Sequence, residues 1–132
     1  MWYLLLLAAA TASPASKVGS SVNRVKYGAQ QTLTCSWFTN FENSRLSQCR
    51  GEHGFAFALG DEASIECWDH SCDKLNAEAR RLTHWKQSDA PSGEFMVTFV
   101  GRVAVERHRT RYLGDGTRTV LMEEVVAVRK AK

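Results

Sequence analysis

The alternation of apolar and polar positions along the chain predicts β-strands. Phe95, Val97 and Phe99 show this period of two most clearly, and Leu33, Cys35 and Trp37 repeat it near the start of the patterned region. Five strands are predicted in all. They cover residues 31–38, 47–61, 63–69, 94–108 and 118–129.

The period changes once, between the third and fourth predicted strands. Leu75, Ala79 and Leu82 follow one another at i, i+4 and i+7, which is the spacing of one helix face. Ser71 or Asp73 is available as the N-cap. The pattern therefore predicts one helix of about 12 residues.

The resulting element order is strand, strand, strand, helix, strand, strand. This is the order of a five-stranded OB barrel, in which the helix lies between the third and fourth strands. We therefore predict an all-β domain with one helix, an OB-like barrel, over residues 31–132. Gly101, in the middle of the fourth strand, suggests a bulge or strong coiling and so favours closure. The alternative is a small α+β roll, with the helix on one face of an antiparallel sheet.

The N-terminal residues have the layout of a secretory signal. A short apolar run is followed by Ala10, Thr11 and Ala12, small residues that suit a cleavage site. The run is too short to cross a bilayer, which takes about 20 residues. We predict that residues 1–12 are a signal peptide and that the protein is exported to the periplasm or the extracellular space without a membrane anchor. Residues 13–30 are small and polar, and we predict a flexible lead-in outside the core.

Four cysteines agree with export, because an even number in an oxidising compartment predicts disulfides. We favour Cys35 with Cys49 and Cys67 with Cys72, because each pair closes a short local loop. The alternative is a metal site in the sequence CWDHSC, where His70 stands between Cys67 and Cys72. Zinc sites use closer cysteine pairs or paired histidines, so we predict no metal ligand here and no cofactor.

Arginine is concentrated in one part of the chain. The formal net charge is +3, and residues 101–118 carry five arginines against two acidic residues, the same net charge of +3. Asp115 and Gly116 predict a hairpin turn between the last two strands. Four arginines, which we name the arginine cluster, surround this turn: Arg107, Arg109, Arg111 and Arg118. The cluster either protects a long ribbon from edge pairing or attracts an anionic partner.

Catalytic chemistry is not indicated by the remaining polar residues. The histidines are far apart and none stands beside a nucleophile motif: His53, His70, His84 and His108. The adjacent carboxylates Asp61–Glu62 and Glu123–Glu124 point to opposite faces of a strand, so neither pair is arranged to share a proton. We predict that the protein is not an enzyme.

Aromatic residues provide a second candidate surface. Strand alternation places Trp37 in the core and Phe38 on the opposite face. Phe38 or Phe41 is therefore a candidate stacking platform for a ligand. Trp68 and Trp85 flank the helix, and we expect both to pack in the core or between helix and sheet.

These features favour a monomeric binding module for an anionic ligand or an acidic protein surface. An oligosaccharide or another polyanion fits the first description. The alternative is an inhibitor or immunity-type protein that binds a secreted hydrolase through arginine and aromatic anchors. Nucleic-acid binding is less favoured, because export and the modest charge count against it.

Overall fold

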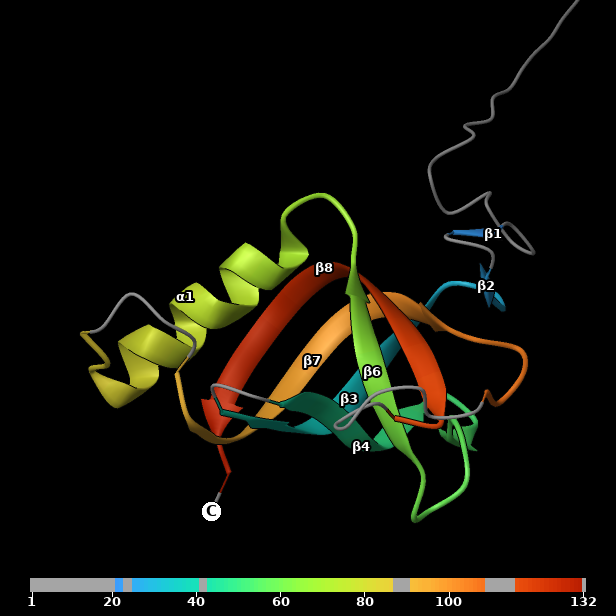
Figure 1. Ribbon diagram of the computed structural model, residues 1–132, viewed down its shortest axis with the longest axis horizontal. Coiled ribbons are helices and arrows are strands. Elements are labelled where there is room, and N and C mark those ends of the chain that lie inside the picture. Colours follow the sequence, from blue (N-terminus) through green and yellow to red (C-terminus); the bar gives the residue numbers. More distant parts are fainter. Residues whose placement is uncertain (1–20, 23–24, 41–42, 87–90, 109–115, 132) are drawn as a thin grey trace, which may run out of the picture.

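The computed structural model describes residues 21–22, 25–40, 43–86, 91–108 and 116–131. The predicted signal peptide, Phe41, Arg109 and Arg111 lie outside these residues. The elements are β1 (Ser21–Val22), β2 (Val25–Lys26), β3 (Gln31–Thr39), β4 (Ser44–Gly51), β5 (Gly54–Phe55), β6 (Glu62–Cys67), α1 (Ser71–Thr83), β7 (Gly93–Val103) and β8 (Arg118–Lys130) (Figure 1). The described chain is therefore mostly β with one helix, as predicted.

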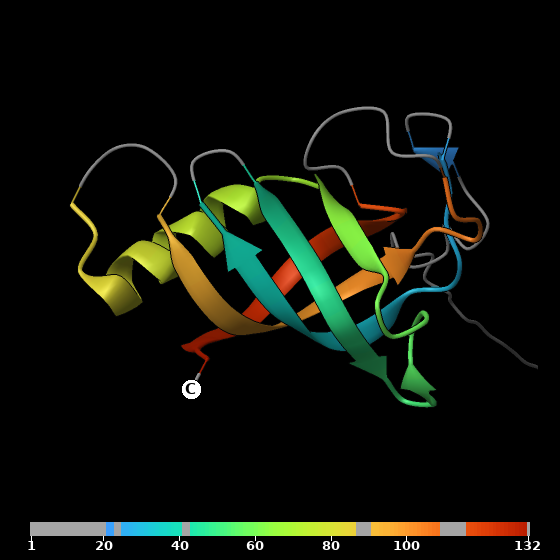
Figure 2. The same ribbon diagram turned by 60° about the horizontal axis from the view of Figure 1, so that its bottom comes forward.

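A six-stranded mixed sheet forms most of the structure, and its pairings make a ring. β3 pairs with both β4 and β7, β7 pairs with β8, and β6 joins β8 to β4. The β6–β8 pairing is parallel and the other pairings are antiparallel. β5 adds a short edge to β4. β3, β4 and β6 lie side by side on the face seen in Figure 2.

The core lies inside this ring. Leu33, Cys35 and Trp37 of β3 are buried, and they stand opposite buried residues of β7. The ring centroids of Trp37 and Phe95 are 5.1 Å apart. The indole Nε1 of Trp37 donates to Ser44 Oγ at 2.8 Å, so its one polar group has a partner. The prediction that Trp37 belongs to the core is confirmed.

Helix α1 follows β6 and packs along β8 (Figure 1). Leu75 and Ala79 are buried against the core, which agrees with the predicted helix face. The predicted N-cap is wrong, because His70 occupies that position in a left-handed conformation. Ser71 lies inside the helix, where its hydroxyl donates to the Met122 carbonyl of β8 at 2.7 Å. This bond fixes the start of the helix to the sheet. Within the described chain, no helix has the length and apolar character needed to cross a membrane.

Trp68 and Trp85 are both half-buried at the two ends of the helix region. Trp68 packs against the buried cluster of Tyr27, Ala104 and Leu121, outside the ring. The backbone N–H of Trp85 donates to the Arg80 carbonyl at 2.9 Å, just beyond the end of α1. Trp68 therefore has the packing role expected of it.

The prediction of one continuous strand over residues 47–61 is wrong. β4 begins earlier, at Ser44, and ends at Gly51; after a turn, β5 is only two residues long. Gly54 follows the turn between β4 and β5, Gly60 lies in the turn after β5, and both have positive φ. The apolar residues at period two therefore do not share one environment, since Phe57 is buried and Leu59 is 63% exposed.

The predicted lead-in contributes to the core, contrary to our expectation. Tyr27 is buried and pairs with Ala104, and the Gly28 N–H donates to the Val103 carbonyl at 2.9 Å. The aromatic ring covers the outer side of β7 and β8, which would otherwise expose Leu121. Burial, with a smaller contribution from the charge of Glu66, raises the pKa of Tyr27 to about 12.

Gly101 of β7 pairs with Met122 of β8, and it follows a register shift in the pairing of these strands. A Cβ atom at this position would collide with the Leu121 carbonyl oxygen and lie 2.9 Å from the Phe99 ring. We expect Gly101→Ala to destabilise the fold by about 2 to 3 kcal/mol, since the β8 backbone must move. Gly28→Ala is the matched control, because its new Cβ would have its nearest neighbour at 3.6 Å. Urea unfolding of both variants measures the difference, and equal losses would contradict the argument.

Candidate functional site

The outer face of β3 and β4 presents three rows of side chains in register, which we name the β3–β4 face. The rows extend onto β6 or β5. They consist of Phe38, Arg45 and Ser64; of Ser36, Ser47 and Glu62; and of Thr34, Arg50 and Phe55. Aromatic and basic residues occupy the outer rows, and the middle row has two serine hydroxyls and the carboxylate of Glu62, which pairs with Arg45.

A bulge in β4 determines which residues reach this face. Gln48 has a positive φ of 52°, and the β3–β4 register shifts beside it. The extra residue turns Cys49 into the core and Arg50 outward. Strict alternation from the buried Leu46 would have sent both side chains the opposite way.

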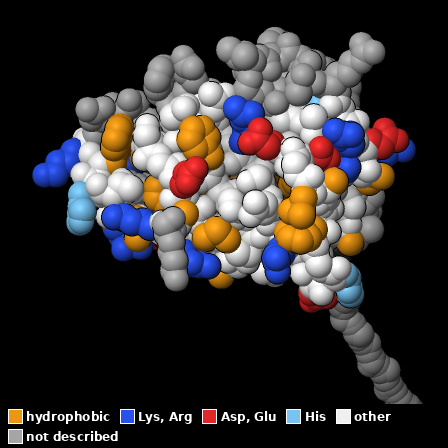
Figure 3. Space-filling model, turned by 90° about the horizontal axis from the view of Figure 1, so that it is seen from below, with side chains coloured by type: hydrophobic (Ala, Val, Ile, Leu, Met, Phe, Trp, Pro, Cys, Tyr) orange, Lys and Arg blue, Asp and Glu red, His pale blue; other side chains and the backbone are white. Residues whose placement is uncertain are grey.

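Two exposed aromatic rings mark the ends of the β3–β4 face. Phe38 is 40% exposed and pairs across the strands with Arg45. Phe55 is 44% exposed, and the Arg50 guanidinium lies 4.5 Å from its ring centroid. The two rings are two rows apart, which is about 13 Å along the strands. Seen from below the molecule, hydrophobic side chains are interspersed with basic and acidic ones (Figure 3).

Most charges near this face are paired. Arg45 Nη1 lies 2.8 Å from Glu62 Oε1, and Arg107 Nη2 lies 3.0 Å from Asp61 Oδ1. Asp61 and Glu62 therefore bind different arginines, as expected of neighbours on opposite sides of the chain. Among the described residues, Arg50 contacts the Phe55 ring and forms no ion pair with a carboxylate.

The described members of the arginine cluster do not form one exposed stripe. β7 ends at Val103, so no strand carries Arg107. Arg118 turns inward, where Nη1 donates to the Ala104 carbonyl at 3.1 Å. Its guanidinium also lies 6.0 Å from the centroid of the Phe57 ring. The proposed role of Arg109 and Arg111 concerns residues outside the described structure.

The described end of the β7–β8 connection bonds to β6, and Asp115 of the predicted turn lies outside the described residues. The Gly116 N–H donates to Ser64 Oγ at 2.9 Å, and the Thr117 N–H donates to the Glu62 carbonyl at 2.9 Å. Gly116 approaches the β6 backbone so closely that no Cβ fits there. These bonds attach Gly116 and Thr117 to β6, the strand that pairs with β4.

The histidines are dispersed in the structure. His53 and His84 are exposed, His70 Nδ1 lies 3.1 Å from Asp73 Oδ2, and His108 Nε2 lies 3.0 Å from Thr119 Oγ1. Among the described residues, no three His, Cys, Asp or Glu side chains converge on a point where a metal ion would fit.

A buried ion pair, which sequence reasoning missed, lies on the other side of the ring. Arg102 has 0% and Glu123 8% of its side chain exposed, and Nε of the arginine lies 3.2 Å from the carboxylate. Gln30 also donates to Glu123 at 3.2 Å, and Arg102 donates to the Gly28 carbonyl at 3.3 Å. The pair therefore attaches the N-terminal segment to β7 and β8. Glu124 is exposed, so the two adjacent carboxylates point apart as predicted.

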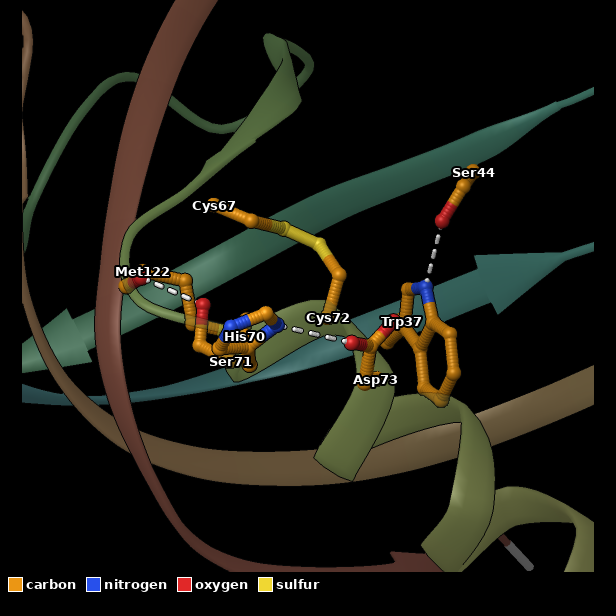
Figure 4. The surroundings of a disulfide bond; sticks show 8 residues. All are labelled: Trp37, Ser44, Cys67, His70, Ser71, Cys72, Asp73 and Met122. Atoms are coloured by element: carbon orange, nitrogen blue, oxygen red, sulfur yellow. Dashed lines mark hydrogen bonds and ion pairs between the residues drawn. A yellow bond between two sulfur atoms is a disulfide. The ribbon is translucent and has the colours of Figure 1, made fainter.

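Both favoured disulfides are present. Cys35–Cys49 links β3 to β4 within the core, and Cys67–Cys72 links the end of β6 to the first turn of α1 (Figure 4). No free cysteine is found among the described residues. The two bonds are compatible with an oxidising, exported location.

Compared with known protein families, with curated proteins and with solved structures, the chain shows no match.

Proposed function

We infer that the ring of strands is an OB-like barrel. The order of pairings supports this interpretation, because the first strand of the ring, β3, pairs with the second and the fourth. The third and fifth strands, β6 and β8, run parallel and complete the ring, and α1 lies between the third and fourth strands in sequence. OB barrels bind oligonucleotides and oligosaccharides on the face of their second and third strands. Those strands correspond here to β4 and β6.

We propose that the protein is an exported, non-catalytic binding module for an extended ligand that carries both rings and anionic groups. An acidic oligosaccharide is the ligand class that fits best. One observation carries the proposal: two exposed phenylalanines, each beside an arginine, stand at the two ends of a polar region that contains Ser36 and Ser47.

The chemistry of each part suits such a ligand. Phe38 and Phe55 offer flat surfaces against which sugar rings can stack. Ser36, Ser47 and Thr34 supply small hydroxyls that donate to or accept from a ligand without filling the space between the rings. Arg50 offers guanidinium donors, which suit carboxylate or sulfate groups.

A nucleic acid fits this face less well, because Glu62 and Asp61 already neutralise Arg45 and Arg107. Binding to an acidic protein surface, as an inhibitor or immunity protein would, is the alternative outcome. The salt dependence of binding distinguishes an acidic oligosaccharide from a protein partner. Affinity for a polyanion falls steeply as the salt concentration rises, whereas affinity at an aromatic protein interface changes little.

The test is binding of the full chain to arrays of acidic and neutral oligosaccharides at low and physiological salt. We expect Phe38→Ala with Phe55→Ala to lower affinity for the acidic oligosaccharides by about a hundredfold, because each stacking contact contributes about 1 to 3 kcal/mol. Val126→Ala is the matched control, since Val126 is an exposed apolar residue on β8, outside the β3–β4 face. Its affinity should not change.

A second variant tests whether the ligand binds to the β3–β4 face or to the arginine cluster. If Arg109→Ser with Arg111→Ser abolishes binding while the double phenylalanine variant binds normally, the ligand contacts the β7–β8 connection instead. Absence of binding to every oligosaccharide would refute the proposed ligand class.

A further inference from the structure

The two disulfides differ in their accessibility. Cys35 and Cys49 are each 0% exposed and belong to the central core cluster. Cys67 and Cys72 are both partly exposed, at the junction of β6 and α1. Thiol–disulfide exchange requires that a thiolate approach one of the two sulfur atoms. Only the second bond offers that approach in the folded protein.

The position of Cys72 favours its release. Cys72 is the second residue of α1 and lies in its first turn, at the positive end of the helix dipole (Figure 4). The N-terminus of a helix stabilises negative charge and therefore a cysteine thiolate. A thiolate that attacks Cys67 Sγ consequently displaces a well-stabilised leaving group.

The loop between the two cysteines is held in a form that opening would relax. Asp69 and His70 both have positive φ, 50° and 63°, a conformation that residues other than glycine adopt at a cost. The disulfide closes this loop, whose ends are separated by 5.6 Å between the Cα atoms. Opening the bond allows the two residues to leave this conformation.

Other bonds keep the two cysteines close after the disulfide opens. The Trp68 N–H donates to the Met122 carbonyl at 3.0 Å, and the Ser71 hydroxyl donates to the same carbonyl at 2.7 Å. Lys74 Nζ also donates to the Val125 carbonyl at 2.8 Å. Both ends of the loop thus remain attached to β8, so that the bond can form again.

We propose that the Cys67–Cys72 bond is a reversible modification site for a low-molecular-weight thiol. The thiolate attacks Cys67 Sγ; a mixed disulfide forms, the Cys67–Cys72 bond breaks and Cys72 leaves as a thiolate. A second thiol then attacks the sulfur of the bound small molecule and releases Cys67. Two small thiols are oxidised to one disulfide, and the two cysteines are reduced. Cys35–Cys49 remains intact throughout.

The experiment exposes the oxidised, folded chain to glutathione buffers of increasing reduced fraction. Iodoacetamide then alkylates free thiols without denaturant, and peptide mass mapping locates them. We expect Cys67 and Cys72 to be alkylated or glutathionylated at least tenfold faster than Cys35 and Cys49, with the far-ultraviolet circular dichroism of the sheet unchanged. Equal labelling of all four cysteines, or no labelling by glutathione, would overturn the proposal.

Two variants make the test specific. Cys67→Ser with Cys72→Ser should take up no label under the same conditions, and labelling of this variant would show that Cys35–Cys49 is the reactive bond. Ser71→Ala removes the hydroxyl bond to Met122 while keeping all four cysteines. We expect it to slow the return of the disulfide in oxidised glutathione severalfold, because Ser71 acts as a positioning residue. An unchanged rate would refute the proposed role of the loop.

Discussion

Glu123→Ala is expected to destabilise the fold by about 3 to 5 kcal/mol, because it leaves the buried guanidinium of Arg102 without its carboxylate. Arg102 is completely buried and its Nε lies 3.2 Å from Glu123 Oε1. The same substitution removes the bond from Gln30 and loosens the attachment of the N-terminal segment. Urea unfolding followed by tryptophan fluorescence measures the loss.

Glu124→Ala is the control for this prediction. It removes the same side chain one position along β8, where the carboxylate is exposed, and should change stability by no more than about 0.5 kcal/mol. Arg102→Met with Glu123→Leu replaces the whole pair by apolar side chains and should recover most of the stability. If the single and the double variants are equally unstable, the cost comes from lost packing and not from an unpaired charge.

Cys35→Ala with Cys49→Ala is expected to cost about 3 to 5 kcal/mol, because the bond both restricts the unfolded chain and connects β3 to β4 inside the core. Its cysteines are 14 residues apart in sequence, against 5 for Cys67 and Cys72. The shorter loop restricts the unfolded chain less, so Cys67→Ser with Cys72→Ser should cost about 2 kcal/mol. Thermal unfolding of the two double variants tests whether loss of Cys35–Cys49 is the more destabilising.

The order of these two losses also bears on the thiol-exchange proposal. A disulfide that opens reversibly must contribute so little to the free energy of unfolding that the domain stays folded without it. If loss of Cys67–Cys72 unfolds the chain and loss of Cys35–Cys49 does not, the short loop is the structural bond and the proposed exchange would destroy the fold.

Local features of the sequence were sufficient for the elements whose side chains alternate regularly. Leu33, Cys35 and Trp37 identified β3, and Phe95, Val97 and Phe99 identified β7, because each strand has one face in the core. The helix and the two disulfides were predicted for a similar reason, since each depends on residues close together in the chain. Phe38 was placed on the exposed side of its strand by the same alternation.

Other features depended on contacts that local sequence does not encode. The bulge at Gln48 contains no glycine that would have predicted it from the sequence. It nevertheless places Arg50 on the β3–β4 face together with Phe38. Leu59 shares the period of Phe57 but is exposed, because the chain turns at Gly60. The bulge at Gln48 thus redirects the side chains that follow it in β4.

The sequence by itself determined the mostly-β character with one helix and the inward faces of β3 and β7, and it favoured the cysteine pairing that the structure contains. Only the tertiary structure decided that Tyr27 belongs to the core, that Arg102 pairs with Glu123 and that the β7–β8 connection docks on β6. The physical reason is distance along the chain. Arg102 meets the Gly28 carbonyl across 74 positions of sequence, and such a contact exists only after the ring of strands has brought its partners together.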